Sequence, residues 1–140
     1  LKKHYLLLSF LFLTSCEPTN IININDLNGY WEIDYITQKG ETFKPKQSSP
    51  LYDYYLLNPP KGIQKKLAPL FDGSFETSAS TLEFEIIQKD QKVVLRYKTP
   101  WETWEKIVEL LNPEKLVLFH EEKKYYYKRP LLFLNSQTNE

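Results

Sequence analysis

The sequence predicts an all-β protein, an antiparallel up-and-down barrel of about seven or eight strands, with a two-sheet sandwich as the second choice. Turn-forming residues interrupt the chain roughly every ten residues from Asp26 onward, and short segments between them alternate apolar and polar residues. A sheet with this many apolar residues is expected to close on itself, since closure removes the exposed edges that favour aggregation.

Composition sets the size and excludes several classes of protein. The chain has 140 residues, of which 41% are apolar and 15% aromatic, which is enough for one domain. Its 18 basic and 18 acidic residues balance, which argues against a nucleic-acid partner because such proteins need a basic surface. The single cysteine excludes an intramolecular disulfide framework and a cysteine-based zinc site.

The first strand is expected over residues 30–37. Trp31, Ile33 and Tyr35 alternate with Glu32, Asp34 and Ile36, so one face of this strand should be buried. The following segments are assigned by composition. Residues 51–57 are tyrosine-rich and typical of a strand or an ordered loop, whereas residues 61–70 lack a clean period and favour a loop or a short helix.

Two hairpins are predicted in the second half of the chain, after a tight turn at Asp72-Gly73 that leads into residues 74–77. Each consists of two alternating segments joined by a short polar turn, at Lys89-Asp90 and at Glu121-Glu122. The segments are residues 82–88 with 93–98, and residues 116–120 with 124–129.

Residues 101–111 fit two structures. Trp104, Ile107, Val108 and Leu111 have helical spacing, and the length suits a helix of about three turns. A strand from about residue 105 would instead continue the meander into the strand at residues 116–120. We favour the strand and keep the helix as the alternative.

The first sixteen residues have the features of a secretion signal. Lys2 and Lys3 precede an apolar stretch over residues 5–13, which as a helix would span roughly 14 Å, about half of a membrane's hydrocarbon core. This length is typical of a signal peptide and too short for a permanent span. The stretch ends in Leu13-Thr14-Ser15-Cys16, which resembles the bacterial lipobox.

The lipobox resemblance implies cleavage before Cys16 and a diacylglyceryl group on its thiol. The alternative is a general secretion signal followed by an ordinary cysteine. Two or more acyl chains anchor a protein stably, so we expect a lipid-anchored protein of the bacterial cell envelope. No acidic cluster follows Cys16, which favours the periplasmic face of the outer membrane. The expected organisation is a signal peptide (1–15), a lipidated cysteine and tether (16–25), a barrel domain (26–134) and a polar tail (135–140).

Gly29-Tyr30-Trp31 at the start of the first strand and Lys128-Arg129 at the end of the last resemble the lipocalin signature. In that family the tryptophan plugs the closed end of the barrel and a late basic residue lies across its indole. The resemblance therefore implies a plug of Gly29, Trp31 and Arg129, in which the cation–π contact contributes about 0.5–2 kcal/mol. First and last strands are neighbours only in a closed sheet, so a Trp31–Arg129 contact tests closure.

Further segments are similar to small lipocalin-like lipoproteins of bacteria. They are residues 43–46, 72–75, 99–101 and 114–120. The chain departs from typical lipocalins in three respects. It is shorter, it lacks a T-D-Y-type second motif, and it continues past Arg129 with the apolar residues 130–134.

Catalytic and metal-binding motifs are absent from the sequence. It contains no H-E-x-x-H, G-x-S-x-G, glycine-rich phosphate loop or C-x-x-C. His120 and Glu122 share a strand face without further ligands, so an exposed turn-edge histidine is the expected role. We predict no enzyme activity, no cofactor and no metal site.

The aromatic residues fit two alternative functions, a ligand pocket or a filled barrel core. As a pocket, rings would provide apolar contact and hydroxyls would orient a small apolar or amphiphilic ligand, with Tyr54, Trp101, Trp104 and Tyr127 as the candidate lining. As core filling, they would leave a barrel that binds protein or glycan at its rim or serves a structural role. A mouth-connected cavity above ~300 Å³ favours the first function, and large side chains at every inward position favour the second.

Overall fold

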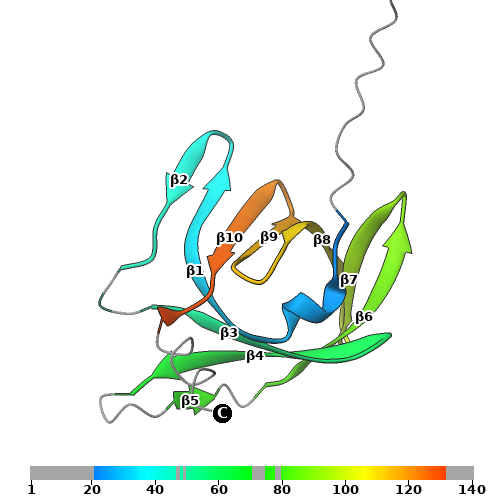
Figure 1. Cartoon of the computed structure of the whole chain (residues 1–140), viewed down its shortest axis with the longest axis horizontal. Coiled ribbons are helices and arrows are strands. Elements are labelled where there is room, and N and C mark those ends of the chain that lie inside the picture. The colour runs from blue at the N-terminus through cyan, green and yellow to red at the C-terminus, as the bar shows by residue number, and fades with distance from the viewer. Residues whose placement is uncertain (1–20, 47, 49, 71–74, 78–79, 132–140) are drawn as a thin grey trace, which may run out of the picture.

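The computed structural model describes residues 21–46, 48, 50–70, 75–77 and 80–131, and this part of the chain is all-β apart from short helical turns (Figure 1). A 3-10 helix, η1 (Ile24–Leu27), precedes the strands. The strands are β1 (Gly29–Gln38), β2 (Glu41–Phe43), β3 (Tyr52–Asn58), β4 (Lys61–Pro69), β5 (Phe75–Thr77), β6 (Leu82–Lys89), β7 (Lys92–Lys98), β8 (Thr103–Leu111), β9 (Lys115–His120) and β10 (Lys123–Lys128).

Eight of these strands form a closed antiparallel barrel. They pair in the order β1-β3-β4-β6-β7-β8-β9-β10, and β10 returns to pair with β1. Ile33 lies opposite Tyr127 in the closing pair. β2 pairs with the last residues of β1, and β5 pairs with the end of β4. The predicted barrel is therefore confirmed, and the sandwich is excluded. Both predicted hairpins, β6–β7 and β9–β10, are present.

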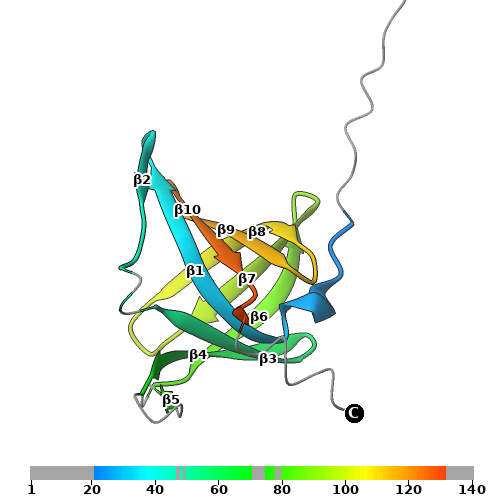
Figure 2. The same cartoon turned by 60° about the vertical axis from the view of Figure 1, so that its left-hand side comes forward.

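One end of the barrel is filled by an apolar floor. η1 lies across this end beside β3 and β8, as Figures 1 and 2 show together. The inward side chains here are large and nearly or fully buried. We define the apolar floor as Leu27, Trp31, Leu95, Val108, Leu111, Leu116 and Leu118.

The predicted faces of Tyr35 and Ile36 are both wrong because of a β-bulge. The register of β1 against β10 shifts between Ile33 and Tyr35, so the extra residue reverses the alternation. Ile36 then packs against the core, and Tyr35 stacks on Tyr126 with ring centroids 4.2 Å apart.

The loop or short helix predicted for residues 61–70 is also wrong, since β4 occupies this segment. Its inward positions hold Gly62, Gln64 and Lys66, so the usual apolar alternation is missing. A buried glutamine in the barrel interior explains why the periodicity was weak.

Residues 101–111 contain the favoured strand and not the helix. β8 has a register shift between Val108 and Leu110, so Trp104 and Val108 face inward before the bulge and Leu111 faces inward after it. The bulge thereby produces the i, i+4, i+7 spacing that resembled a helix. The strand begins at Thr103, slightly before the predicted start.

The ends of the chain fall partly outside the described residues. The predicted signal peptide, Cys16 and most of the apolar residues after Arg129 lie there, as does the polar tail. Of the predicted tether, Ile22 and Ile24 pack against the core. Among the described residues, none forms a helix with the length and apolar character that a membrane span needs.

We expect Gly62→Ala to destabilise the barrel by about 2–3 kcal/mol, because overpacking forces the surrounding side chains to shift. An added Cβ would lie 2.4 Å from Cζ of Phe84 and 2.9 Å from Cδ2 of Leu57. The Phe84 ring is 3% exposed and packs against Tyr97, so it has little room to move. Urea unfolding measures the loss.

Gly40→Ala is the control for this prediction. Gly40 has a positive φ of 82°, but an added Cβ meets nothing within 4 Å, so only backbone strain of about 1 kcal/mol is expected. Equal midpoints for the two variants would contradict the close packing of Gly62 on Phe84.

Candidate functional site

Arg129 closes the end of the barrel at the apolar floor. Its guanidinium lies 3.7 Å from the ring centroid of Trp31, and the Trp31 indole N–H donates to the carbonyl of Leu27 at 2.9 Å. Arg129 also donates to four backbone carbonyls, those of Asp26, Asn28, Tyr30 and Pro113. Gly29 has a φ of +100°, and a Cβ there would lie 3.3 Å from Arg129 Nη1. The plug implied by the lipocalin resemblance is present, and its role is structural.

Polar side chains occupy the barrel interior next to the apolar floor. We call them the polar layer, which consists of Asp53, Gln64, Lys66, Tyr97, Lys106 and Tyr127. They come from β3, β4, β7, β8 and β10. Asp53 and Gln64 are each 1% exposed, and Tyr97 is also fully buried.

Asp53 is the centre of one half of the polar layer. Its Oδ2 accepts a hydrogen bond of 3.0 Å from the Tyr127 hydroxyl, and its Oδ1 pairs with Lys66 Nζ at 2.8 Å. Burial and the Asp53 carboxylate both raise the pKa of Tyr127, so this hydroxyl remains a donor at neutral pH. The Lys66 side chain is 63% exposed and therefore leads from the polar layer to solvent.

Gln64 and Lys106 form the other half. The Gln64 Oε1 accepts a hydrogen bond of 2.7 Å from the Tyr97 hydroxyl and lies 3.5 Å from Lys106 Nζ. The ammonium also lies 4.7 Å from the centroid of the Tyr97 ring. Burial lowers the pKa of Lys106 to about 8, an effect that Asp53 opposes and Lys66 reinforces.

The four candidate lining residues do not come together. Tyr127 lies in the polar layer, and Trp104 stacks on Tyr97 with ring centroids 5.1 Å apart. Tyr54 packs against Tyr30 on the outer wall, because the neighbouring Asp53 and Tyr55 point inward. Trp101 is 89% exposed in the β7–β8 loop. The assignments of Tyr54 and Trp101 to the barrel lining are therefore wrong.

Sequence reasoning missed Asp53, Gln64, Lys66 and Lys106. One signal was available for Lys106, because a strand through Trp104 and Val108 places residue 106 on the same inward face. An inward lysine in an otherwise apolar alternation is costly and indicates function. Asp53 and Gln64 gave no such signal. Residues 51–57 were predicted as either a strand or an ordered loop, and residues 61–70 were wrongly predicted as a loop or a short helix.

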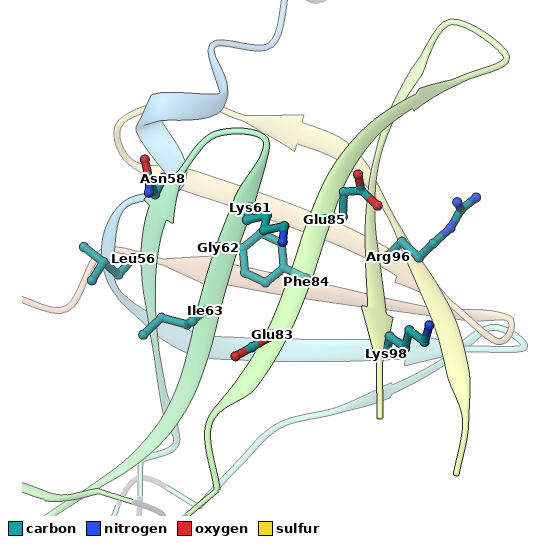
Figure 3. Close-up of a pocket in the computed structure, with 10 residues that line it drawn as sticks. All are labelled: Leu56, Asn58, Lys61, Gly62, Ile63, Glu83, Phe84, Glu85, Arg96 and Lys98. Carbon is teal, nitrogen blue, oxygen red and sulfur yellow. The ribbon is translucent and has the colours of Figure 1, made fainter. Parts of the chain in front are cut away.

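Two hollows among the described residues lie on the outer wall. The larger has a volume of about 590 Å³ and is drawn in Figure 3, where Ile63, Glu83 and Arg96 come from β4, β6 and β7. The backbone of Gly62 contributes to its lining, together with Leu56 and Glu85. The smaller, about 380 Å³, lies between β1, the start of β3 and residues 44–46. Neither is a cavity of the kind predicted for a ligand inside the barrel.

No protein-family model matches the chain, and no curated protein sequence matches it. Solved structures with a similar overall fold include a lipocalin-like protein from Bacteroides uniformis, with a TM-score of 0.48 and 18% identity over 75% of this chain and 99% of that chain. An uncharacterised protein from Bacteroides eggerthii has a TM-score of 0.47 and 14% identity over 74% of this chain and 99% of that chain. Lobster apocrustacyanin A1 has a TM-score of 0.46 and 11% identity over 81% and 68% of the two chains.

Metal-ligating side chains do not gather in the described part of the chain, which contains no group of three or more that could hold an ion. The Nδ1 of His120 lies 2.9 Å from the backbone carbonyl of Glu105, and Nε2 lies 3.7 Å from Glu121. His120 is therefore held by its neighbours on β8 and in the β9–β10 turn, and its side chain is only 20% exposed, so the expectation of an exposed histidine is wrong.

Lys106→Met is expected to stabilise the protein at pH 7 by about 1–3 kcal/mol, because methionine has a similar length and no buried charge. The pKa of Lys106 is lowered from 10.5 to about 8, so below pH 8 both states hold the proton and the native state bears the full cost. Above pH 8 the native state releases the proton while the unfolded chain retains it. Wild-type stability should therefore rise between pH 8 and pH 9.5 and approach that of the variant.

Urea unfolding of both proteins at several pH values measures this difference. A variant less stable than wild type at pH 7 would show that the Lys106 ammonium is well compensated in the native barrel.

Proposed function

We propose that this protein is a lipid-anchored, lipocalin-like protein of the bacterial cell envelope that binds a small amphiphilic molecule without catalysing a reaction. The observation that supports binding is the division of the barrel interior into an apolar floor and a polar layer. Purely structural barrels gain stability from apolar interiors, whereas buried charges such as Asp53 and Lys106 cost stability.

The apolar floor limits where the ligand binds. Trp31, Leu95 and Leu118 are fully buried, so they leave no room for a ligand at the closed end. The ligand therefore binds at the opposite end, where Lys66 reaches solvent and the partly buried side chains are apolar. These apolar side chains are Ile36, Leu82, Trp104 and Tyr125.

Native mass spectrometry of the whole protein, released gently from its host's membranes, tests the binding function. We expect a reproducible excess mass that is lost on extraction with organic solvent. A protein of bare mass that also fails to bind added amphiphiles would contradict the proposal. Metabolic labelling with radioactive palmitate tests the anchor, with label expected on the wild type and none on Cys16→Ala.

A second candidate function is a filled barrel that binds a protein or a glycan at its rim. The filled apolar floor and the position of both hollows on the outer wall favour it. Cross-linking at the exposed Trp101 in the β7–β8 loop distinguishes the two functions, since a rim partner would be captured there while a small ligand would not.

A further inference from the structure

Lys106 carries a charge that no acidic side chain balances. Within the described part of the chain, its ammonium contacts the Gln64 Oε1 and the face of Tyr97. None of the ion pairs among residues 21–46, 50–70 and 80–131 includes it. The one buried carboxylate, that of Asp53, is already paired with Lys66 and accepts from Tyr127. The Lys106 side chain is only partly buried, so an incoming group can reach it.

Gln64 presents a donor without an acceptor in the described part of the chain. Lys106 can only donate, so the Gln64 amide must place its oxygen toward Lys106 and its nitrogen away. That nitrogen, Nε2, is buried and has no hydrogen-bond partner among the described residues. Buried donors of this kind are rare and normally have a partner. In the described part of the chain, the Gln64 Nε2 thus lacks an acceptor and the Lys106 ammonium lacks an ion-pair partner.

The charges of the interior favour a negatively charged group. Lys66 and Lys106 oppose a single carboxylate in the polar layer, which leaves one positive charge. Lys123 adds another at the open end, since it shares the inward face of β10 with Tyr125 and Tyr127. A cationic group would meet repulsion here, and a neutral hydroxyl would leave the Lys106 charge unbalanced.

Resting on the amphiphile binding proposed above, we propose that the polar group of the ligand is an anion, a carboxylate or a phosphate, bound by the ammonium of Lys106 and the side-chain N–H of Gln64. Lys66 lies at the entrance and contributes attraction at longer range. The apolar part of the ligand packs on Trp104 and its apolar neighbours at the open end.

Calorimetric titration of the full chain in phosphatidylcholine nanodiscs, with empty discs subtracted, tests this proposal. The probes are octanoate, octyl phosphate, octanol and inorganic phosphate. We expect the two charged amphiphiles to bind about tenfold or more tightly than octanol, since charge-assisted hydrogen bonds are the strongest that a ligand can form here. If inorganic phosphate binds as tightly as octyl phosphate, the anion site is supported. Its ligand is then a free anion and not an amphiphile.

Two variants test whether the preference for anionic amphiphiles depends on Lys106. Lys106→Met should remove the preference for the anions over octanol. Gln64→Glu should do the same, because a carboxylate beside Lys106 supplies the missing negative charge internally. Lys65→Met is the matched control, since residue 65 lies between Gln64 and Lys66 and points to the outer face of β4. It should keep the preference.

The remaining outcomes separate the two proposals. If octanol binds as tightly as octanoate, the barrel binds amphiphiles but the anion site is overturned. If none of the four probes binds, the proposed function itself fails. An anion preference that persists in both Lys106→Met and Gln64→Glu, with unfolding midpoints that show both to be folded, would also overturn the assignment to Lys106.

Discussion

Trp31→Ala is expected to destabilise the protein by about 3–5 kcal/mol, the largest effect of any substitution considered. Trp31 is fully buried at the centre of the apolar floor, and its indole N–H donates to Leu27. Alanine would remove this bond, leave a cavity among the leucines and abolish the contact with the Arg129 guanidinium. Urea unfolding monitored by far-ultraviolet circular dichroism gives the free energy directly.

Trp101→Ala is the matched control, because it removes the same side chain from a position that is 89% exposed. Its effect should stay within about 0.5 kcal/mol. A Trp31→Ala midpoint that coincides with that of Trp101→Ala would contradict the assignment of Trp31 as the plug.

Arg129→Ala is expected to cost about 2–3 kcal/mol, less than the loss of Trp31. The guanidinium connects four carbonyls from three segments, namely η1, the β1 start and the β8–β9 turn. Most of these carbonyls remain accessible to water when the side chain is removed, which limits the cost. Hydrogen exchange of the β1 and β10 amides should accelerate, because Arg129 holds together the strands that close the barrel.

The chain's other arginine provides the control for this prediction. Arg96 lies on the outer wall and forms two hydrogen bonds with Glu105, at 3.0 and 2.8 Å. Exposed ion pairs contribute about 0–1 kcal/mol, so Arg96→Ala should have little effect. If Arg96→Ala were as destabilising as Arg129→Ala, the bonds to the backbone carbonyls would not be what stabilises the closed end.

Lys106 in the polar layer connects the predictions about stability with the prediction about ligand binding. Lys106→Met is expected to make the protein more stable and less able to bind an anion, so one substitution separates folding from function. Residues that lower stability where they function are common at binding sites, because a charge selected for its ligand remains uncompensated without it.

Sequence periodicity was sufficient for the strands whose inward face is apolar. The strands predicted at β1, β6, β7, β9 and β10 are present, although in β1 the alternation reverses at the bulge after Ile33. Short polar turns define the two hairpins. It failed where inward residues are polar, as in β4, and it was ambiguous where a bulge changes the period, as in β8. In both cases the deviation from simple alternation arises from interactions with other strands.

Local sequence patterns therefore define the all-β class, the hairpins and the Trp31–Arg129 pair, because each depends on neighbouring residues or on a recognisable motif. The polar layer depends on contacts across the barrel, such as Lys106 with Gln64 and Tyr127 with Asp53, which are 42 and 74 residues apart in the chain. Strand tilt, register and bulges decide which inward side chains meet, and these are properties of the closed sheet as a whole. Only the tertiary structure could show that an uncompensated lysine and an unpartnered amide face the same interior.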